Sequence, residues 1–241
     1  MSGTFKSIIH SHIDWGTAPT KEEWVTYRKE LFETYFLEAL KCQTEKNFEV
    51  ILHIHKNFTY CIEQFKELEA RSDFTIHIVG NEDKHPLATD KILEDCKKYD
   101  WVYHTRCDTD DFFSKVAMER IQNCTPEVQK AFIFQTGFNY NMDCKRIGIY
   151  GARFQSNSTI VFPTDYFLDP VKSVEYGICR HLRVKQQFHH EMMGNHQYCI
   201  LTHKHNDSTG WSGSRSIKPL HWNIFLENFP IMQQYHEDMM K

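Results

Sequence analysis

The first half of the chain alternates short β-like segments with amphipathic helical segments, and this alternation constrains the fold more than any other feature. The capping box Thr20-Lys21-Glu22-Glu23 opens the first predicted helix, whose apolar residues form one stripe as far as Leu40. Strand and helix that alternate with short connections predict right-handed crossovers and a mostly parallel sheet. We expect strands at 5–10, 48–54, 74–79 and 101–105, and further helices at 61–70, 89–98 and 113–121.

The pattern changes after residue 131, where short β-like runs are separated by irregular segments. We expect strands there at 131–135, 146–150, 159–162 and 198–202. No repeat or Gly/Ser-rich linker divides the 241 residues, and this length suits one large α/β domain. We therefore predict a single domain, 1–241, with a Rossmann-type open sheet: a parallel nucleotide-sugar-binding half at 1–124 and a mixed acceptor half at 125–241.

Composition excludes several protein classes. An aromatic content of 14% is too high for a disordered chain. The apolar runs are shorter than the ~18–20 residues that span a bilayer, and the first nine residues lack the features of a secretory signal. The eight cysteines form no Cys-x-x-Cys pair, which disfavours a zinc knuckle or a redox motif. We expect a soluble cytoplasmic protein without membrane insertion.

The net charge of −4 hides an uneven distribution. Residues 145–218 hold ten Lys/Arg and five Asp/Glu, a net charge of +5, so the remainder has a net charge of −9. This basic segment is compatible with an anionic ligand or acceptor, and equally with chance clustering on a solvated face.

Three carboxylates follow the fourth predicted strand directly, in the turn Arg106-Cys107-Asp108-Thr109-Asp110-Asp111. Ligands of open α/β sheets bind beyond the carboxyl ends of the strands. Carboxylates crowded in this way repel one another unless a cation or hydrogen-bond donors compensate. Asp108 and Asp110 share a face in extended chain and suit Mg²⁺ or Mn²⁺, which would bridge a diphosphate. The alternative is a solvated loop in which Asp110 or Asp111 caps a helix near Phe113.

Several segments, in order, give the chain a resemblance to a known family. The acidic turn is similar to the motif Thr-Arg-x-Asp-x-Asp-Asp of the "putative rhamnosyltransferases", a branch of the GT-A nucleotide-sugar glycosyltransferases. The segments that resemble other motifs of this family are 28–35, 43–48, 114–122 and 201–206.

The resemblance implies a GT-A-like fold and metal-dependent transfer of a sugar from a nucleotide-sugar donor to an acceptor hydroxyl, with inversion. It implies that Asp110 is the principal ligand of Mn²⁺ or Mg²⁺, with Asp108 nearer the ribose or the metal. Arg106 would pair with Asp108 or a phosphate, and His203 would approach the metal or the diphosphate. Arg28, in the first-helix motif, is expected in the donor site.

Other candidate site residues come from their chemistry and position. Inversion needs a general base; Glu191, isolated in the basic half, is the first candidate and Asp111 the second. Glu191 is equally compatible with a surface residue paired to a neighbouring histidine. Gln135 is positioned to hydrogen-bond a sugar, although its segment also fits a hairpin turned by Gly137. Asp14 follows the first strand, where a nucleotide base would bind.

Three functions stay open at this level. The first is sugar transfer onto a glycan or small molecule. The second is the same chemistry on a hydroxymethylated base of DNA, which the basic segment with interleaved aromatic residues permits. The third is a nucleotide- or sugar-binding module without activity, against which the intact acidic turn argues.

Overall fold

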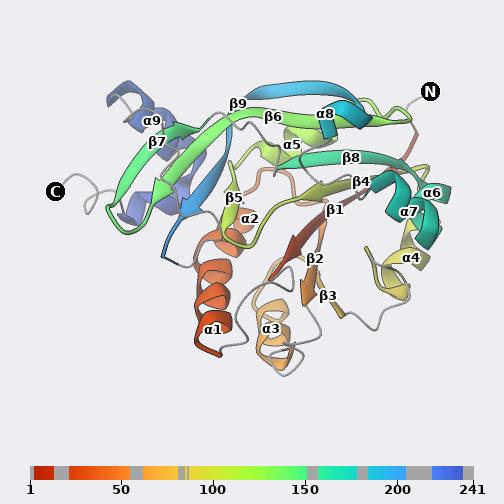
Figure 1. Cartoon of the computed structure of the whole chain (residues 1–241), viewed down its shortest axis with the longest axis horizontal. Coiled ribbons are helices and arrows are strands. Elements are labelled where there is room, and N and C mark those ends of the chain that lie inside the picture. The colour runs from red at the N-terminus through yellow and green to blue at the C-terminus, as the bar shows by residue number, and fades with distance from the viewer. Residues whose placement is uncertain are drawn as a thin grey trace.

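The computed structural model describes residues 3–13, 22–54, 62–80, 85, 87–150, 157–177, 184–204 and 219–235. Within these residues nine strands form one open sheet of order β3-β2-β1-β4-β8-β6-β9-β5, with β7 paired to β6 (Figure 1). The strands are β1 (Phe5–His12), β2 (Glu49–Ile54), β3 (Ile76–Gly80), β4 (Trp101–Arg106), β5 (Asp111–Phe113), β6 (Lys130–Asn141), β7 (Arg146–Tyr150), β8 (Ser158–Pro163) and β9 (His189–Thr202).

The N-terminal half is parallel, as the alternation predicted. β1 pairs with both β2 and β4, and β2 pairs with β3, all in parallel. The first helix begins as α1 (Glu22–Leu31) and continues through a π-helical segment (Phe32–Leu37) into α2 (Glu38–Lys41). The predicted cap residue Thr20 lies outside the described residues. The other helices of this half are α3 (Ile62–Glu69), α4 (Asp90–Cys96) and α5 (Ala117–Gln122).

The C-terminal half extends the same sheet with mixed pairing. β8 runs antiparallel to β4 and β6, β9 is parallel to β6, and β5 and β7 are antiparallel to their partners. This arrangement confirms the predicted open α/β sheet and is consistent with a GT-A-like fold. The remaining helices are α6 (Thr164–Leu168), α7 (Pro170–Gly177), α8 (Val184–Gln187), α9 (Pro219–Asn228) and a 3-10 turn at Pro230–Met232. None of the described helices is both long and apolar enough to cross a membrane.

The sheet buries both of its faces. Successive side chains of a strand point to opposite faces, so Ile8 and Ile9 of β1 belong to different hydrophobic clusters. The cluster of Ile9 packs under α1, α3 and α5, whereas that of Ile8 packs under α4 and α6. Figure 1 shows α1 and α3 on one side of β1–β3, with α4, α6 and α7 on the other. Helices on both faces leave the carboxyl edge of the parallel strands as the place for a site.

The predicted helix at 113–121 is wrong at its start. Residues Asp111–Phe113 form the short strand β5, and α5 begins only at Ala117. Phe112 and Phe113 are buried in two different clusters, as the two-residue period of a strand requires. The partner of β5 is β9, more than 80 residues later, and no local pattern reveals that pairing. Asp110 and Asp111 therefore do not cap a helix.

The alternative of a hairpin turned by Gly137 is excluded, because Gly137 lies inside the long strand β6. A Cβ atom there would lie 2.5 Å from the carbonyl oxygen of Tyr198, so the glycine permits a close approach of β9. The pairing of β6 with β9 shifts register between Thr136 and Phe138, at this same position.

Candidate active site

The acidic turn connects β4 to β5 at the carboxyl edge of the sheet. Its backbone is fixed from two sides. The hydroxyl of Thr109 donates to the carbonyl of His12 in β1 at 3.2 Å. The amide of Leu201 in β9 donates to the carbonyl of Asp110 at 3.1 Å. The backbone of the turn therefore has a defined conformation, and its three carboxylates have different hydrogen-bond partners.

Asp110 joins three distant parts of the chain. Its Oδ2 atom accepts an ion-paired hydrogen bond from Nη1 of Arg28 in α1. The same oxygen lies 3.2 Å from Nε2 of His203, just beyond β9. The ring of Tyr27 packs edge-on against His203, with the ring centroids 5.2 Å apart. The structure thus brings together Arg28, Asp110 and His203, all of which the sequence analysis had named.

Asp110 and Asp111 have opposite electrostatic surroundings. Burial by itself raises the pKa of Asp110, but the charge of Arg28 and the hydrogen bonds from His203 and Arg28 hold it below the ordinary value. Asp111 is only 4% exposed, and Nδ2 of Asn157 donates to its Oδ2 at 3.3 Å. Burial, with the negative charges of Asp110 and Asp108, raises the pKa of Asp111 well above its usual range. Asp110 is therefore the more acidic and Asp111 the more basic member of the neighbouring pair.

Asp108 pairs with Arg106, one of the two arrangements that the resemblance implied. Nη2 and Nε of Arg106 both donate to Oδ1 of Asp108, at 2.9 and 3.2 Å. Arginines thus offset the charges of Asp108 and Asp110, whereas the sequence argument had assigned that compensation to a divalent cation or to unspecified donors. A metal is therefore not needed to explain why the turn tolerates its carboxylates.

Asp110 and His203 nevertheless fit a divalent ion. Ligands about 2.1 Å from a six-coordinate ion lie about 3 Å from their neighbours, close to the 3.2 Å between Oδ2 of Asp110 and Nε2 of His203. In the described part of the chain, no third His, Cys, Asp or Glu ligand atom completes a group with these two. Water and ligand oxygens would supply the other positions.

The structure does not bring Glu191 to this site. In β9, Glu191 lies opposite Phe132 of β6, which faces Thr159 of β8 and, through it, Thr105 of β4. Three strand steps therefore separate Glu191 from β4, or roughly 14 Å. It forms an ion pair with Lys130, whose Nζ lies 3.0 Å from its Oε2. Its assignment as the general base has no geometric support.

Gln135 shares the face of Arg106. Ile133, two positions earlier in β6, lies opposite Ser158, which in turn faces Arg106. Gln135 is exposed and lies two strands away from β4, or roughly 10 Å. Gln135 therefore stays a candidate for a donor contact. Asp14 lies outside the described residues.

Two residues of the site escaped the sequence analysis. Tyr27, which packs on His203, lies immediately before the first-helix motif at 28–35, so its place beside that motif was the available signal. Asn157, which holds Asp111, lies in an irregular segment that carries no local signal.

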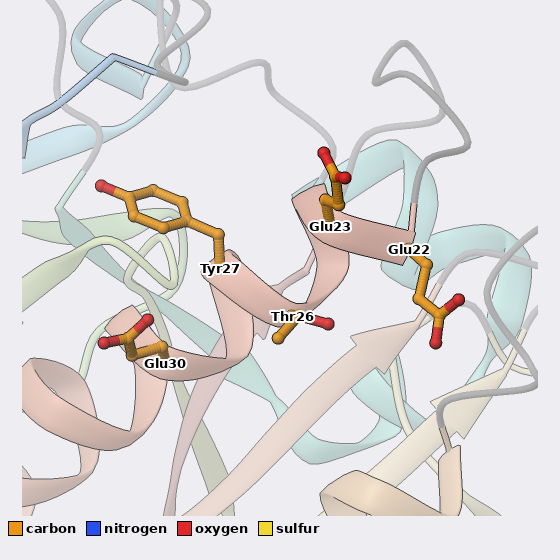
Figure 2. A pocket seen from close by; sticks show the side chains of 5 residues that line it. All are labelled: Glu22, Glu23, Thr26, Tyr27 and Glu30. Atoms are coloured by element: carbon orange, nitrogen blue, oxygen red, sulfur yellow. The ribbon is translucent and has the colours of Figure 1, made fainter.

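An acidic pocket adjoins the site along α1 and shares Tyr27 with it. Its volume is about 450 Å³, and Figure 2 shows its lining side chains projecting from successive turns of the helix. Burial and then the charges of Asp143 and Glu30 raise the pKa of Tyr27, and Asp110 adds to this effect. Tyr27 therefore both lines the pocket and contacts His203 of the site. The residues that line the pocket are Glu22, Glu23, Thr26, Tyr27 and Glu30.

Comparison with solved structures finds several matches at low identity. TarS 1-349 of S. aureus in complex with UDP-GlcNAc is 11% identical, with a TM-score of 0.45, over 92% of this chain and 64% of that chain. HddC of Yersinia pseudotuberculosis is 10% identical, with a TM-score of 0.43, over 82% and 93%. The inositol-1-phosphate CTP transferase of T. maritima is 10% identical, with a TM-score of 0.43, over 97% and 98%.

Comparison with curated proteins finds no significant match. The model of one protein family, described as "Putative rhamnosyl transferase", matches residues 2–213, nearly the whole chain. This match confirms the resemblance that the ordered motifs indicated. The chain belongs to the putative rhamnosyl transferase family.

Proposed function

We propose that this protein transfers a sugar from a nucleotide-sugar donor to an acceptor hydroxyl, with Mn²⁺ or Mg²⁺ as cofactor. The observation that carries the proposal is the convergence of Arg28, Asp110 and His203 at the carboxyl edge of the sheet. One anionic oxygen, one imidazole nitrogen and one guanidinium group meet there, which suits a metal-bound diphosphate. Family membership supports the same class of donor.

Each charged side chain of the site has a role in this proposal. Asp110 and His203 hold the metal, which when bound neutralises the charge that develops on the diphosphate leaving group. Arg28, now paired with Asp110, donates to phosphate oxygens through its planar guanidinium group. Arg106 and Asp108 contact the phosphate or the ribose, and Gln135 the sugar.

For the general base we propose Asp111, because the other candidate, Glu191, lies three strands away from β4 and forms an ion pair with Lys130. The acceptor oxygen attacks the anomeric carbon, the bond from that carbon to the diphosphate oxygen breaks, and the hydroxyl proton passes to the carboxylate of Asp111. Direct displacement of this kind inverts the configuration. Asp111→Asn should bind donor but lose transfer, whereas the matched variant Glu191→Gln should transfer at the normal rate. Normal transfer by Asp111→Asn would remove it as the base.

The acceptor approaches, in this proposal, from the pocket on α1. Glutamate carboxylates accept hydrogen bonds from hydroxyl groups and repel a polyanion, so Glu22, Glu23 and Glu30 favour a glycan or small molecule over DNA. Acceptor affinity should consequently change little with salt. A steep loss of acceptor affinity as salt increases would instead favour the hydroxymethylated bases of DNA.

The decisive experiment is a screen of nucleotide sugars for thermal stabilisation and for hydrolysis, with and without Mn²⁺. Wild type and Glu191→Gln should respond to the same donor only when the metal is present, and Asp110→Asn should not respond. Normal binding and turnover by Asp110→Asn would refute the metal assignment. Metal-independent donor binding without any hydrolysis or transfer would favour the non-catalytic module.

A further inference from the structure

Four histidines lie together at the carboxyl ends of β1, β2 and β4, on the face of the sheet that packs under α4 and α6. His12 of β1 is the cross-strand partner of His53 of β2, and His10 lies two residues earlier on the same face as His12. The ring centroids of His12 lie 4.4 Å from His10 and 4.9 Å from His53. His104 of β4 is the fourth member. The sheet thus concentrates imidazole nitrogens beside the acidic turn.

His10 carries the observation that points to a ligand. Its side chain is only 2% exposed, and its Nδ1 lies 2.9 Å from Nε2 of His104 in a hydrogen bond. The other ring nitrogen, Nε2, is buried and has no hydrogen-bond partner among the described residues. Buried polar atoms nearly always have a hydrogen-bond partner or a ligand, so this nitrogen is expected to bind a group that is not part of the protein. A metal-ligating histidine typically has its second nitrogen hydrogen-bonded, as His104 does for His10.

The spacing of the nitrogens matches a small transition-metal site. One ring nitrogen each from His10, His12 and His53 lie within 4.8 Å of one another. Nitrogen ligands at about 2.0–2.1 Å from a tetrahedral Zn²⁺ ion lie roughly 3.3 Å apart, so small rotations of the rings would close the site. Imidazole ligands favour Zn²⁺, Cu²⁺ or Ni²⁺ over Mg²⁺, which prefers oxygen.

The local charges are compatible with a cation. Burial, followed by the neighbouring imidazoles, keeps the pKa of His10 well below its usual range, and burial does the same for His12. Both rings are therefore neutral, which is the form that binds metals. The positive charge of Arg106 nearby is offset by Asp108, to which it donates at 2.9 Å.

We propose that His10, His12 and His53 bind one Zn²⁺ or chemically similar transition-metal ion at the carboxyl ends of β1 and β2, with the fourth position open to water or an anion. This site does not depend on the proposed function. The carbonyl of His10 accepts from the amide of Cys107 at 3.1 Å, and that of His12 from Thr109, so the ion would fix the strand end that supports the acidic turn.

The proposal is tested on the full chain, stripped with EDTA and titrated with Zn²⁺ against a chromophoric chelator. Wild type should bind one ion per chain, and Co²⁺ in its place should give the intense visible bands of tetrahedral coordination. His12→Gln and His53→Gln should each bind at least about 100-fold more weakly, more than loss of an outer-shell partner costs. The matched control is His189→Gln, an exposed histidine of β9.

Asp110→Asn separates this site from the proposed Mn²⁺ or Mg²⁺ site, because it should bind Zn²⁺ as wild type does. Loss of the ion in Asp110→Asn but not in His12→Gln would place it at the acidic turn and overturn the proposal. So would the absence of binding by wild type, or equal weakening in His189→Gln. His12 and His53 are half-buried, and thermal unfolding by circular dichroism checks that their variants fold. If one of these two variants fails to fold, the Zn²⁺ affinity of the other tests the proposal.

Discussion

The ion pair of Asp110 with Arg28 gives a sharp stability prediction. Both side chains are nearly buried, at 11% and 12% exposure, whereas those of Asp108 and Arg106 are exposed at 27% and 20%. Removing one charge of a buried pair leaves the other charge desolvated without compensation, at a cost of about 3–5 kcal/mol. Removing one charge of a more exposed pair costs less, falling toward about 1 kcal/mol for a pair at the surface. Asp110→Asn should therefore destabilise the protein several-fold more than Asp108→Asn.

Both substitutions conserve side-chain size, so the comparison isolates charge from packing. The free energy of unfolding is measured by urea denaturation with EDTA present, which removes any contribution from bound metal. In the double variant Asp110→Asn with Arg28→Gln, no buried charge stays unpaired, so its loss should be smaller than the sum of the single losses. Equal losses for Asp110→Asn and Asp108→Asn, or strict additivity in the double variant, would refute the reasoning.

Two further predictions concern stability away from the acidic turn. In urea denaturation, the free energy of unfolding of Gly137→Ala should be about 1–3 kcal/mol below that of wild type, because the added Cβ would meet the backbone of Tyr198. Gly194→Ala should lose less than about 1 kcal/mol, because its Cβ would meet only the flexible end of the Arg120 side chain. Similar losses in the two variants would contradict the close approach of β9 at Gly137. Hydrogen bonds from Lys6 and Lys98 lower the pKa of Asp95 to about 2. The carboxylate of Asp95 therefore contributes fully to the stability of the folded protein above about pH 4, and this contribution is lost as the pH falls through about 2. Because Asp95 is partly exposed, the effect is small: between about pH 4 and about pH 2 the free energy of unfolding of wild type should fall by about 1 kcal/mol more than that of Asp95→Asn. Parallel pH profiles of the two proteins would contradict this prediction.

The sequence indicated the parallel half of the fold because its signals are local. Strand and helix periodicity, together with short connections, predicted β1 to β4 and the helices between them. The position of Asp108 and Asp110 beyond β4 followed from the same pattern and from the rule that ligands bind at carboxyl ends. The resemblance then implied that His203 approaches the metal or the diphosphate and that Arg28 lies in the donor site.

The tertiary structure decided what depends on contacts between distant residues. Arg28 and Asp110 are separated by 82 residues, and Asp110 and His203 by 93, so their shared hydrogen bonds leave no periodic trace in the sequence. The position of Glu191 depends on the pairing of β9 with β6 and of β6 with β8, and a register shift of one residue would move its side chain to the other face of the sheet. Local periodicity specifies the elements of this protein, but only the pairing of its strands specifies which charges meet.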